Sequence, residues 1–164
     1  MIANKQVILP IVGIHGVFSV QRLVDFVRTA IAMGCSTVVI SKAMGAAAQS
    51  GVPEAQKVVF KSGRNMIVVA DIPDVVELLE PEKLIFITRS EHNTPAIDFN
   101  DILKLVKGQK SVILMFPGSE PGFSLREIEY GEAYSLPFVE RPGLSPIAML
   151  AICLFELKRL QILD

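Results

Sequence analysis

The chain contains no tryptophan, only two tyrosines and two cysteines, and no long apolar run. Nine phenylalanines supply most of the aromatic side chains, so we expect a mainly aliphatic core. Cys35 and Cys153 lie in apolar contexts, with no Cys-x-x-Cys pair and no histidine at ligand spacing. This predicts buried thiols in a reducing compartment, and no metal site. The longest apolar stretches, 7–18 and 144–155, fall short of the ~20 residues of a membrane span. We therefore expect a soluble, cytoplasmic protein without a signal peptide.

The chain also lacks an excess of charge of either sign. Its net charge is −1, which argues against a strongly basic nucleic-acid binder, because such proteins hold phosphates with many lysines and arginines. Basic residues form two modest groups: Lys57, Lys61 and Arg64, and then Lys104, Lys107 and Lys110. Solvated helix faces explain both groups, and a weak RNA track is the alternative.

What the sequence does contain is a regular alternation of short apolar runs and amphipathic segments. The apolar runs predict strands at 7–12, 37–40, 66–70, 84–88, 111–116 and 135–139. Between them, capping residues and helical periodicity predict helices at 19–33, 53–61, 73–80, 98–107, 124–131 and 145–160. Such alternation indicates an α/β protein with a mostly parallel six-stranded sheet and helices on both faces. We expect one domain over residues 1–164.

Parallel sheets bind ligands at the carboxyl ends of their strands, which directs attention to the loops 13–18, 88–95, 117–122 and 140–145. The loop after the fifth strand holds two glycines and two prolines, and a glycine lets the backbone approach a ligand closely. The segment 141–146 enters the last helix, whose first N–H groups are free to bind an anion. Taken alone, the first segment is better explained as a turn into a capped helix, and the second as ordinary helix capping.

Together these segments resemble the SpoU-type family of SPOUT methyltransferases. The resemblance rests on GSEPGFSLREIEYGEAYSLPF, from residue 118, and on RPGLSPIAMLAICLFELKRL, from residue 141. In that family a Gly-Ser-Glu loop precedes a short acidic helix and an Ile-Pro-like strand, and a Ser-Leu-Asn-Val-Ser turn then enters a helix of small and aliphatic residues. A weaker likeness lies upstream, where Arg28-Thr29-Ala30 matches the family's first motif.

The resemblance implies a trefoil knot over about residues 84–160 and an S-adenosylmethionine cofactor. It also implies 2′-O-methylation of a ribose in tRNA or rRNA by a homodimer whose substrate site is shared between protomers. Transferred by position, the catalytic residues would be Arg28, Glu120 and Ser145. The cofactor pocket would be lined by Thr88, Met115, Gly118, Leu136, Phe138 and Leu144.

The sequence departs from the family at polar positions. Arg22 and Ser145 stand where the family has asparagine, and Ile147 stands where it has serine. Serine has one donor fewer than asparagine and a shorter reach, and Pro146 removes a backbone N–H. An alternative hypothesis is therefore a catalytically degenerate SPOUT-fold module that binds RNA or another protein. A third is an unknotted doubly wound domain that binds a different nucleotide.

Four further features have two interpretations each. His15, in a turn flanked by glycines, could act as an acid–base group or be structural, whereas His92 lies in a polar loop with Arg89 and could meet RNA or the methionine end of the cofactor. Arg28 could belong to a surface ion ladder with Asp25. The last helix carries an apolar stripe that is either core or a dimer face: Ile147, Leu150, Ala151, Leu154 and Leu157.

Overall fold

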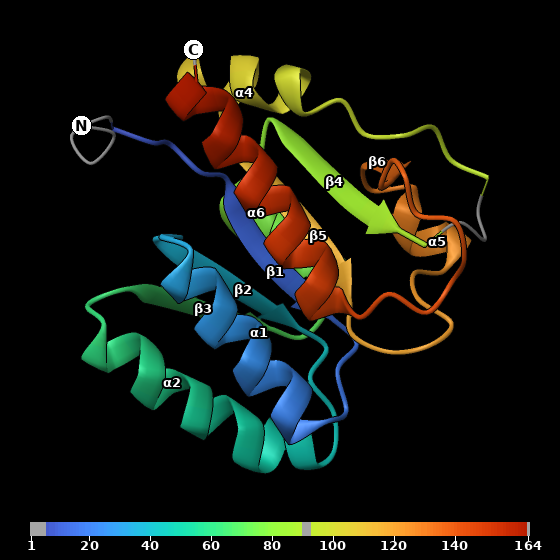
Figure 1. The fold of residues 1–164 in the computed structure, drawn as a ribbon. Helices are drawn as coiled ribbons and strands as arrows, with labels where there is room; N and C mark the ends of the chain where they lie inside the picture. The colour runs from blue at the N-terminus through green and yellow to red at the C-terminus, as the bar shows by residue number, and fades with distance from the viewer. Residues whose placement is uncertain (1–5, 90–92, 164) are drawn as a thin grey trace.

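The computed structural model describes residues 6–89 and 93–163, and its centre is a parallel β-sheet of six strands (Figure 1). The strands are β1 (Ile11–His15), β2 (Thr37–Ser41), β3 (Asn65–Val69), β4 (Lys83–Thr88), β5 (Val112–Pro117) and β6 (Glu132–Ser135). Their order across the sheet is β3-β2-β1-β5-β4-β6, and every neighbouring pair is parallel. The predicted α/β class with a six-stranded parallel sheet is confirmed.

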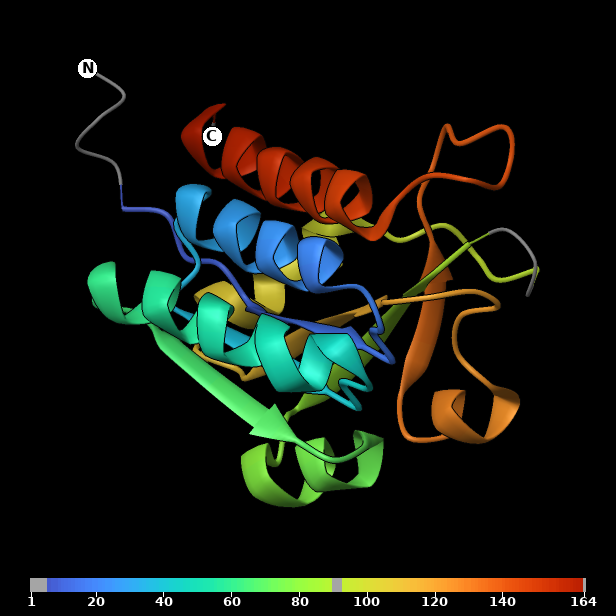
Figure 2. The same cartoon turned by 90° about the horizontal axis from the view of Figure 1, so that it is seen from below.

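Helices cover both faces of this sheet (Figure 2). The helices are α1 (Val20–Ala32), α2 (Val52–Lys61), α3 (Ile72–Leu79), α4 (Phe99–Lys107), α5 (Leu125–Ile128) and α6 (Pro146–Leu163), and a π-helical turn, η2 (Ala47–Gly51), leads into α2. The connections through α1, α2 and α4 step across the sheet in one direction, and those through α3 and α5 step in the other. Since parallel crossovers are right-handed, the two sets lie on opposite faces.

Two buried clusters fill the spaces between the sheet and its helices. The larger lies under α1, α2, α4 and α6, where Val12, Ile14 and Leu114 project from the central strands. The smaller lies on the α3 face and contains Ile72, Phe86 and Phe123, among others. Strand β5 is buried along its whole length, as expected for a central parallel strand.

Both cysteines belong to the larger cluster. Cys35 and Cys153 are free thiols with no exposed surface, so the prediction of core thiols is confirmed. Burial raises the pKa of the Cys35 thiol to about 12, which leaves it protonated and unreactive at neutral pH.

The predicted helix starts are confirmed by capping contacts. The backbone N–H of Arg22 donates to the Ser19 hydroxyl over 3.1 Å, and that of Asn100 donates to Asp98 over 3.0 Å. Ser124 and Glu127 form the reciprocal capping box that their spacing predicts, so α5 begins where expected although it lasts only one turn.

The first strand begins later than predicted. Residues 7–10 lie outside the sheet, where the Gln161 side chain of α6 binds the Ile8 backbone: the Ile8 N–H donates to Oε1 and Nε2 donates to the Ile8 carbonyl, each over 2.9 Å. The strand instead continues through Gly13 to His15, so the predicted turn at 13–15 is wrong. Pro10 explains the shift, because a residue without an N–H cannot join a central ladder.

The sixth strand begins earlier than predicted, at Glu132 rather than at Ser135. It is an edge strand of half-buried residues, so its sequence lacks the apolar run typical of the buried strands. Residues 136–144 leave the sheet as a loop, in which Phe138 has a positive φ of 66°.

Among residues 6–89 and 93–163, no helix is both long enough and apolar enough to cross a membrane. The trefoil knot at about 84–160 and the single-domain boundary at 1–164 stay predictions.

Candidate functional sites at the carboxyl edge of the sheet

The strand order creates a switch point between β1 and β5. The chain leaves β1 toward β2 and β3, and later fills the other half of the sheet from β4 and β5. In open parallel sheets, ligands bind at the carboxyl ends of the strands beside such a point, where the loops diverge. Two groups of polar residues lie at this edge, one beside β4 and β6 and the other at the end of β1.

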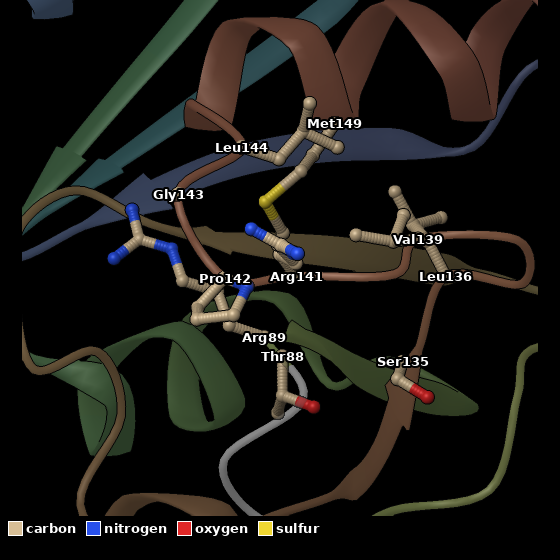
Figure 3. A pocket seen from close by; sticks show the side chains of 10 residues that line it. All are labelled: Thr88, Arg89, Ser135, Leu136, Val139, Arg141, Pro142, Gly143, Leu144 and Met149. Carbon is tan, nitrogen blue, oxygen red and sulfur yellow. The ribbon is translucent and has the colours of Figure 1, made fainter.

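The first group lines a pocket between the ends of β4 and β6 and the start of α6 (Figure 3). Its lining residues are Thr88, Arg89, Ser135, Leu136, Val139, Arg141, Pro142, Gly143, Leu144 and Met149. The enclosed space is small, about 70 Å³. Apolar side chains form the floor below α6, and polar groups lie toward the ends of the strands.

The structure brings three of the six predicted cofactor residues to this pocket: Thr88, Leu136 and Leu144. Met115 does not line it, because its side chain is buried in the cluster on the α3 face. Phe138 is fully exposed and points away into a groove beside α6.

Gly118 also lies outside the pocket lining, and a different contact explains this glycine. Its N–H donates to the carbonyl of His15 over 2.7 Å. A Cβ at this position would lie 2.7 Å from that same carbonyl oxygen and 2.9 Å from Val17. The loop after β5 therefore packs against the end of β1 at a distance that only glycine allows.

Arg89 is the unusual residue of the pocket. Its side chain is only 6% exposed, and its guanidinium forms an ion pair with Glu120, whose side chain is 71% exposed. Within the part of the chain that the structure describes, Nε of Arg89 has no hydrogen-bond partner. A buried donor without a partner is costly, so the Nε–H of Arg89 is available to a second acceptor beside Glu120.

The hydroxyl groups of Thr88 and Ser145 make hydrogen bonds within the protein at the pocket. Thr88 Oγ1 donates to the Tyr134 carbonyl over 3.2 Å and shares a hydrogen bond of 2.9 Å with Thr94 Oγ1, which fixes the end of β4 beside β6. Ser145, the predicted catalytic serine, caps α6 by accepting from the Ala148 N–H over 3.1 Å.

The other two predicted catalytic residues are separated. Glu120 reaches the pocket rim through its ion pair with Arg89, whereas Arg28 is exposed on α1 and is not among the residues that line the pocket. Arg22, one and a half turns earlier on the same helix, is the arginine that contacts the loop after β5: its Nη1 donates to the Gly118 carbonyl over 3.0 Å.

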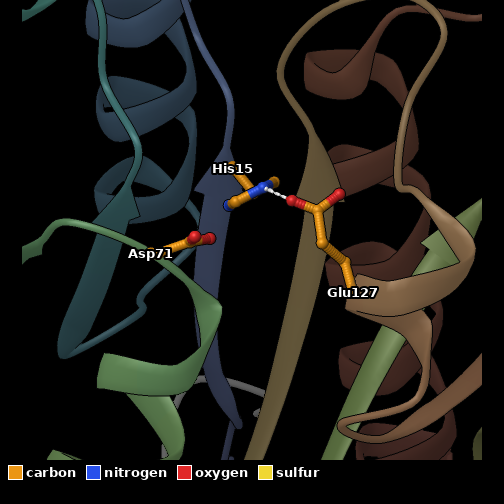
Figure 4. Close-up of side chains that lie close together, drawn as sticks. All are labelled: His15, Asp71 and Glu127. Carbon is orange, nitrogen blue, oxygen red and sulfur yellow. Dashed lines mark hydrogen bonds and ion pairs between the residues drawn. The ribbon is translucent and has the colours of Figure 1, made fainter.

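The second group surrounds His15, the last residue of β1, which is 5% exposed (Figure 4). A hydrogen bond of 2.6 Å joins its Nδ1 to the hydroxyl of Ser41 at the end of β2, and its Nε2 bonds a carboxylate oxygen of Glu127 on α5. Asp71, at the start of α3, approaches from the other side. One ligand atom from each of His15, Asp71 and Glu127 lies within 4.8 Å of the others.

The environment of Glu127 favours its ionised form. Burial alone would raise its pKa, but the Ser124 N–H and the His15 ring outweigh burial, so the pKa lies below its usual value. The His15 ring also stacks on Phe123, with ring centres 5.8 Å apart.

This second group was not predicted as a site from the sequence. The spacing of Ser124 and Glu127 predicts only a capping box, no pattern distinguishes Asp71, and His15 is predicted in a turn. The available signal was positional, since all three residues follow or end strands at the carboxyl edge. His92, the other candidate histidine, lies outside the described residues.

The two basic groups lie away from both sites. Lys61 ends α2 and Arg64 precedes the start of β3, while Lys107 ends α4 and Lys110 precedes the start of β5. Because the strands are parallel, these positions share the amino edge of the sheet, opposite the pocket. They therefore do not form an RNA track beside it.

The fold is that of the SpoU-type SPOUT methyltransferases. The SpoU methyltransferase AviRb from Streptomyces viridochromogenes, solved with the cofactor AdoMet, matches 98% of this chain with a TM-score of 0.72 at 14% identity. A probable methylase family protein from Haemophilus influenzae matches 91% of this chain with a TM-score of 0.66, also at 14% identity. The chain spans 64% and 63% of the lengths of these two proteins. Identity at this level shows the fold alone.

The sequence itself belongs to the family described as RecB-family nuclease (DUF2122), whose model matches residues 45–156. A relative from Aeropyrum pernix, named "Putative type II restriction enzyme", is 35% identical over 150 residues, which is 89% of this chain and 90% of the relative. The chain is thus a member of a family with a nuclease description and has the fold of RNA methyltransferases.

Proposed function

We propose that this protein binds S-adenosylmethionine in the Arg89 pocket and transfers its methyl group to a ribose 2′-oxygen of tRNA or rRNA, as a cytoplasmic homodimer. The buried guanidinium of Arg89 carries this proposal, because it offers an unmet donor to an anionic group inside a pocket with apolar walls. The likeness of the fold to AviRb, solved with this cofactor, supports it.

The chemistry of the lining fits such a cofactor. Leu136, Leu144 and Met149 offer apolar contacts to a purine. Arg89 offers donors to a carboxylate, and a charge-assisted bond of this kind is about twice as strong as a neutral one. The site thus presents an apolar half and a cationic half, which matches a ligand with an adenosyl and an amino-acid end.

The space does not yet accommodate the whole ligand. The pocket encloses about 70 Å³, whereas small-molecule sites usually offer at least about 300 Å³. Its outer wall is the loop 137–143, which is mostly exposed, and Gly143 there has a φ of +119° and open space around its α-carbon. Binding therefore requires this loop to move outward, while the β-strands and α6 stay in place.

Bound S-adenosylmethionine supplies an electrophilic methyl group on a sulfonium. The protein's own part is to hold and orient the reactants. An anion that pairs with Arg89 competes with Glu120 for the guanidinium, and this leaves the Glu120 carboxylate at the pocket rim to accept a proton from the ribose hydroxyl. The guanidinium of Arg28 is a cation that only donates hydrogen bonds, so its role is to bind a phosphate or stabilise developing charge. In a homodimer with a shared substrate site, Arg28 need not reach the pocket of its own chain.

A groove beside α6 supports the homodimer. It has a volume of about 640 Å³, and its apolar lining includes Phe138, Ile152 and Phe155, which are 100%, 42% and 63% exposed. A protruding aromatic ring next to an apolar groove is self-complementary, which suits a two-fold interface. We expect a dimer by light scattering, and a monomer after Phe138→Ser with Phe155→Ser.

Two measurements test the proposed function. Titration calorimetry should detect S-adenosylmethionine binding by the wild type. The control variant Arg126→Met removes an exposed arginine on α5 that is not among the residues lining the pocket, and it should bind the ligand as well as the wild type does. A folded dimer that binds none at millimolar ligand would reject the proposal. Transfer of labelled methyl to cellular RNA should be abolished by Arg28→Ala and by Glu120→Ala; transfer that persists in both would reject these two roles. Binding without transfer would favour the degenerate SPOUT-fold module.

The family description suggests a second candidate, cleavage of nucleic acid, and one observation favours it. The side chains of His15, Asp71 and Glu127 offer ligand atoms for a cation. A cation bound there could assist the hydrolysis of a phosphodiester. Incubation of plasmid DNA and of RNA with the protein and Mn²⁺ tests this candidate. Cleavage by the wild type but not by Glu127→Gln would support it, and intact substrates would reject it.

A further inference from the structure

We propose that His15, Asp71 and Glu127 form a binding site for one divalent transition-metal ion, of the Zn²⁺ or Mn²⁺ kind. The proposal concerns the cation alone and depends neither on methyl transfer nor on nucleic-acid cleavage.

The first argument is position. His15 is the last residue of β1. It pairs in register with Pro117 of β5 and with Ser41 of β2, so its ring lies at the switch point of the sheet. Here the loops diverge to opposite faces, and ligands of parallel sheets collect at this place. Asp71 follows β3 and Glu127 follows β5, so three separate connections bring one ligand each.

The second argument is the donor set. One imidazole nitrogen and two carboxylate oxygens lie within 4.8 Å of one another. Ligand atoms about 2.1 Å from an ion lie roughly 3 to 4 Å apart. An ion would therefore separate Nε2 of His15 from the Glu127 oxygen that it now bonds, and would draw the Asp71 oxygen in by at most about 1 Å. The mixture of nitrogen and oxygen suits Zn²⁺ or Mn²⁺ better than Mg²⁺ or Ca²⁺, which prefer oxygen alone.

The third argument is that the ligands are already oriented. Ser41, fully buried, is bonded to Nδ1 of His15 and fixes the ring with Nε2 toward Glu127. Glu127 accepts from the Ser124 N–H through its other oxygen over 2.8 Å, and Asp71 accepts from the Ile72 N–H over 2.7 Å. Metal sites hold their ligands by this kind of outer contact.

The fourth argument is charge. Two carboxylates, with up to two negative charges, lie beside one buried imidazole ring. An imidazole can carry at most one positive charge, so it cannot balance both carboxylates. A divalent ion bound by the three ligands neutralises both carboxylates. Three protein ligands also leave a coordination position open to water or to an oxygen of another molecule.

The test is binding of Mn²⁺ to the full chain, followed by the loss of its free-ion electron paramagnetic resonance signal. Manganese avoids thiolates, so Cys35 and Cys153 do not confuse the result. We expect one Mn²⁺ per chain, displaced by equimolar Zn²⁺, and a rise in the melting temperature when the ion is added. Absence of binding for both ions would overturn the proposal.

Conservative variants keep the test independent of folding. Asp71→Asn retains a residue that caps helices, and Glu127→Gln retains the reach to Ser124, so both should fold. We expect each variant to bind Mn²⁺ at least about tenfold more weakly, as removal even of outer contacts does. Glu129→Gln, which removes an exposed carboxylate next to α5, is the matched control and should bind as the wild type does. Equal binding by all four proteins would place the ion elsewhere and refute the site.

Discussion

The Arg89 pocket and the His15 cluster lie at the same edge of one sheet, yet their chemistry is opposite. The pocket buries a positive charge among apolar side chains, and the carboxylate that pairs with this charge, that of Glu120, is mostly exposed. The cluster gathers two carboxylates around an imidazole, and a cation is what it suits. The loop after β5 joins the two, since Glu120 in this loop pairs with Arg89 and Ser124 at its end caps the helix that holds Glu127.

This difference shows how one fold can carry more than one chemistry. The pocket occupies the region for which the SpoU resemblance predicts a cofactor, whereas the cluster lies where the strand order alone favours a ligand. On both proposals, the fold specifies where a ligand would bind, and local side chains specify its chemistry. The coexistence of a methyltransferase fold with a nuclease family description is less contradictory in this light.

The largest expected effect comes from the loop after β5 that joins the two sites, residues 118–124, which we call the joining loop. Gly118→Ala places a Cβ 2.7 Å from the His15 carbonyl oxygen, so we expect the free energy of unfolding to fall by about 3 kcal/mol. Urea unfolding measures it. Ser119→Ala, which removes one hydrogen bond to the Gly16 carbonyl, is the control and should cost about 1 kcal/mol. Similar losses for both variants would contradict the close packing of this loop on β1.

The next effect separates the two sites. Arg89→Met removes the buried cation but keeps the apolar bulk, so S-adenosylmethionine should bind roughly 10 to 100 times more weakly. Stability should stay constant or rise, because a poorly paired buried charge is lost. Glu127→Gln should leave this affinity unchanged. Calorimetry on the three proteins decides, and an effect of Glu127→Gln as large as that of Arg89→Met would show that the two sites are one.

The third effect depends on pH. The pKa of Glu127 is lower in the folded protein than its usual value of 4.5, so the ionised carboxylate stabilises the fold above that value. This contribution is lost as pH falls through the folded pKa. The wild type should therefore be more stable than Glu127→Gln near neutral pH, and the gap should shrink below about pH 4.5. Urea midpoints across pH 3 to 7 measure the gap, and a gap independent of pH would contradict the assignment.

The smallest effect concerns the exposed end of the joining loop. Glu120→Gln breaks the ion pair with Arg89, but the Glu120 side chain is 71% exposed, so stability should change by less than about 1 kcal/mol. Mn²⁺ binding at the other end of the loop should not change. A weaker Mn²⁺ affinity in this variant would mean that the pocket and the cluster are coupled.

The sequence predicts most of the fold, because the signals of its buried elements are local. The apolar runs of β2, β4 and β5 and the caps of α1, α4 and α5 could be assigned directly. The starts of two strands could not be assigned in this way. Strand β6 is an edge strand without an apolar pattern, and the start of β1, a central strand, is displaced by Pro10 and by the distant Gln161 side chain. Such effects depend on contacts between residues far apart in the chain.

The candidate sites were less predictable for the same reason. The family resemblance points to Thr88, Leu136 and Leu144, which line one pocket, and to Phe138, which is exposed on a loop with a left-handed backbone conformation that no local pattern predicts. His15, Asp71 and Glu127 meet only because the strand order brings three connections to one point.

The contact between Gln161 and Ile8 has a consequence for how the molecule loses its structure. The last turn of α6 holds the backbone of a segment 153 residues earlier, through two hydrogen bonds. The segment around Ile8 therefore cannot separate from the last turn of α6 without the loss of both hydrogen bonds. Deleting residues 161–164 should increase amide hydrogen exchange just before β1 as much as within the shortened helix, although the two regions share no local sequence.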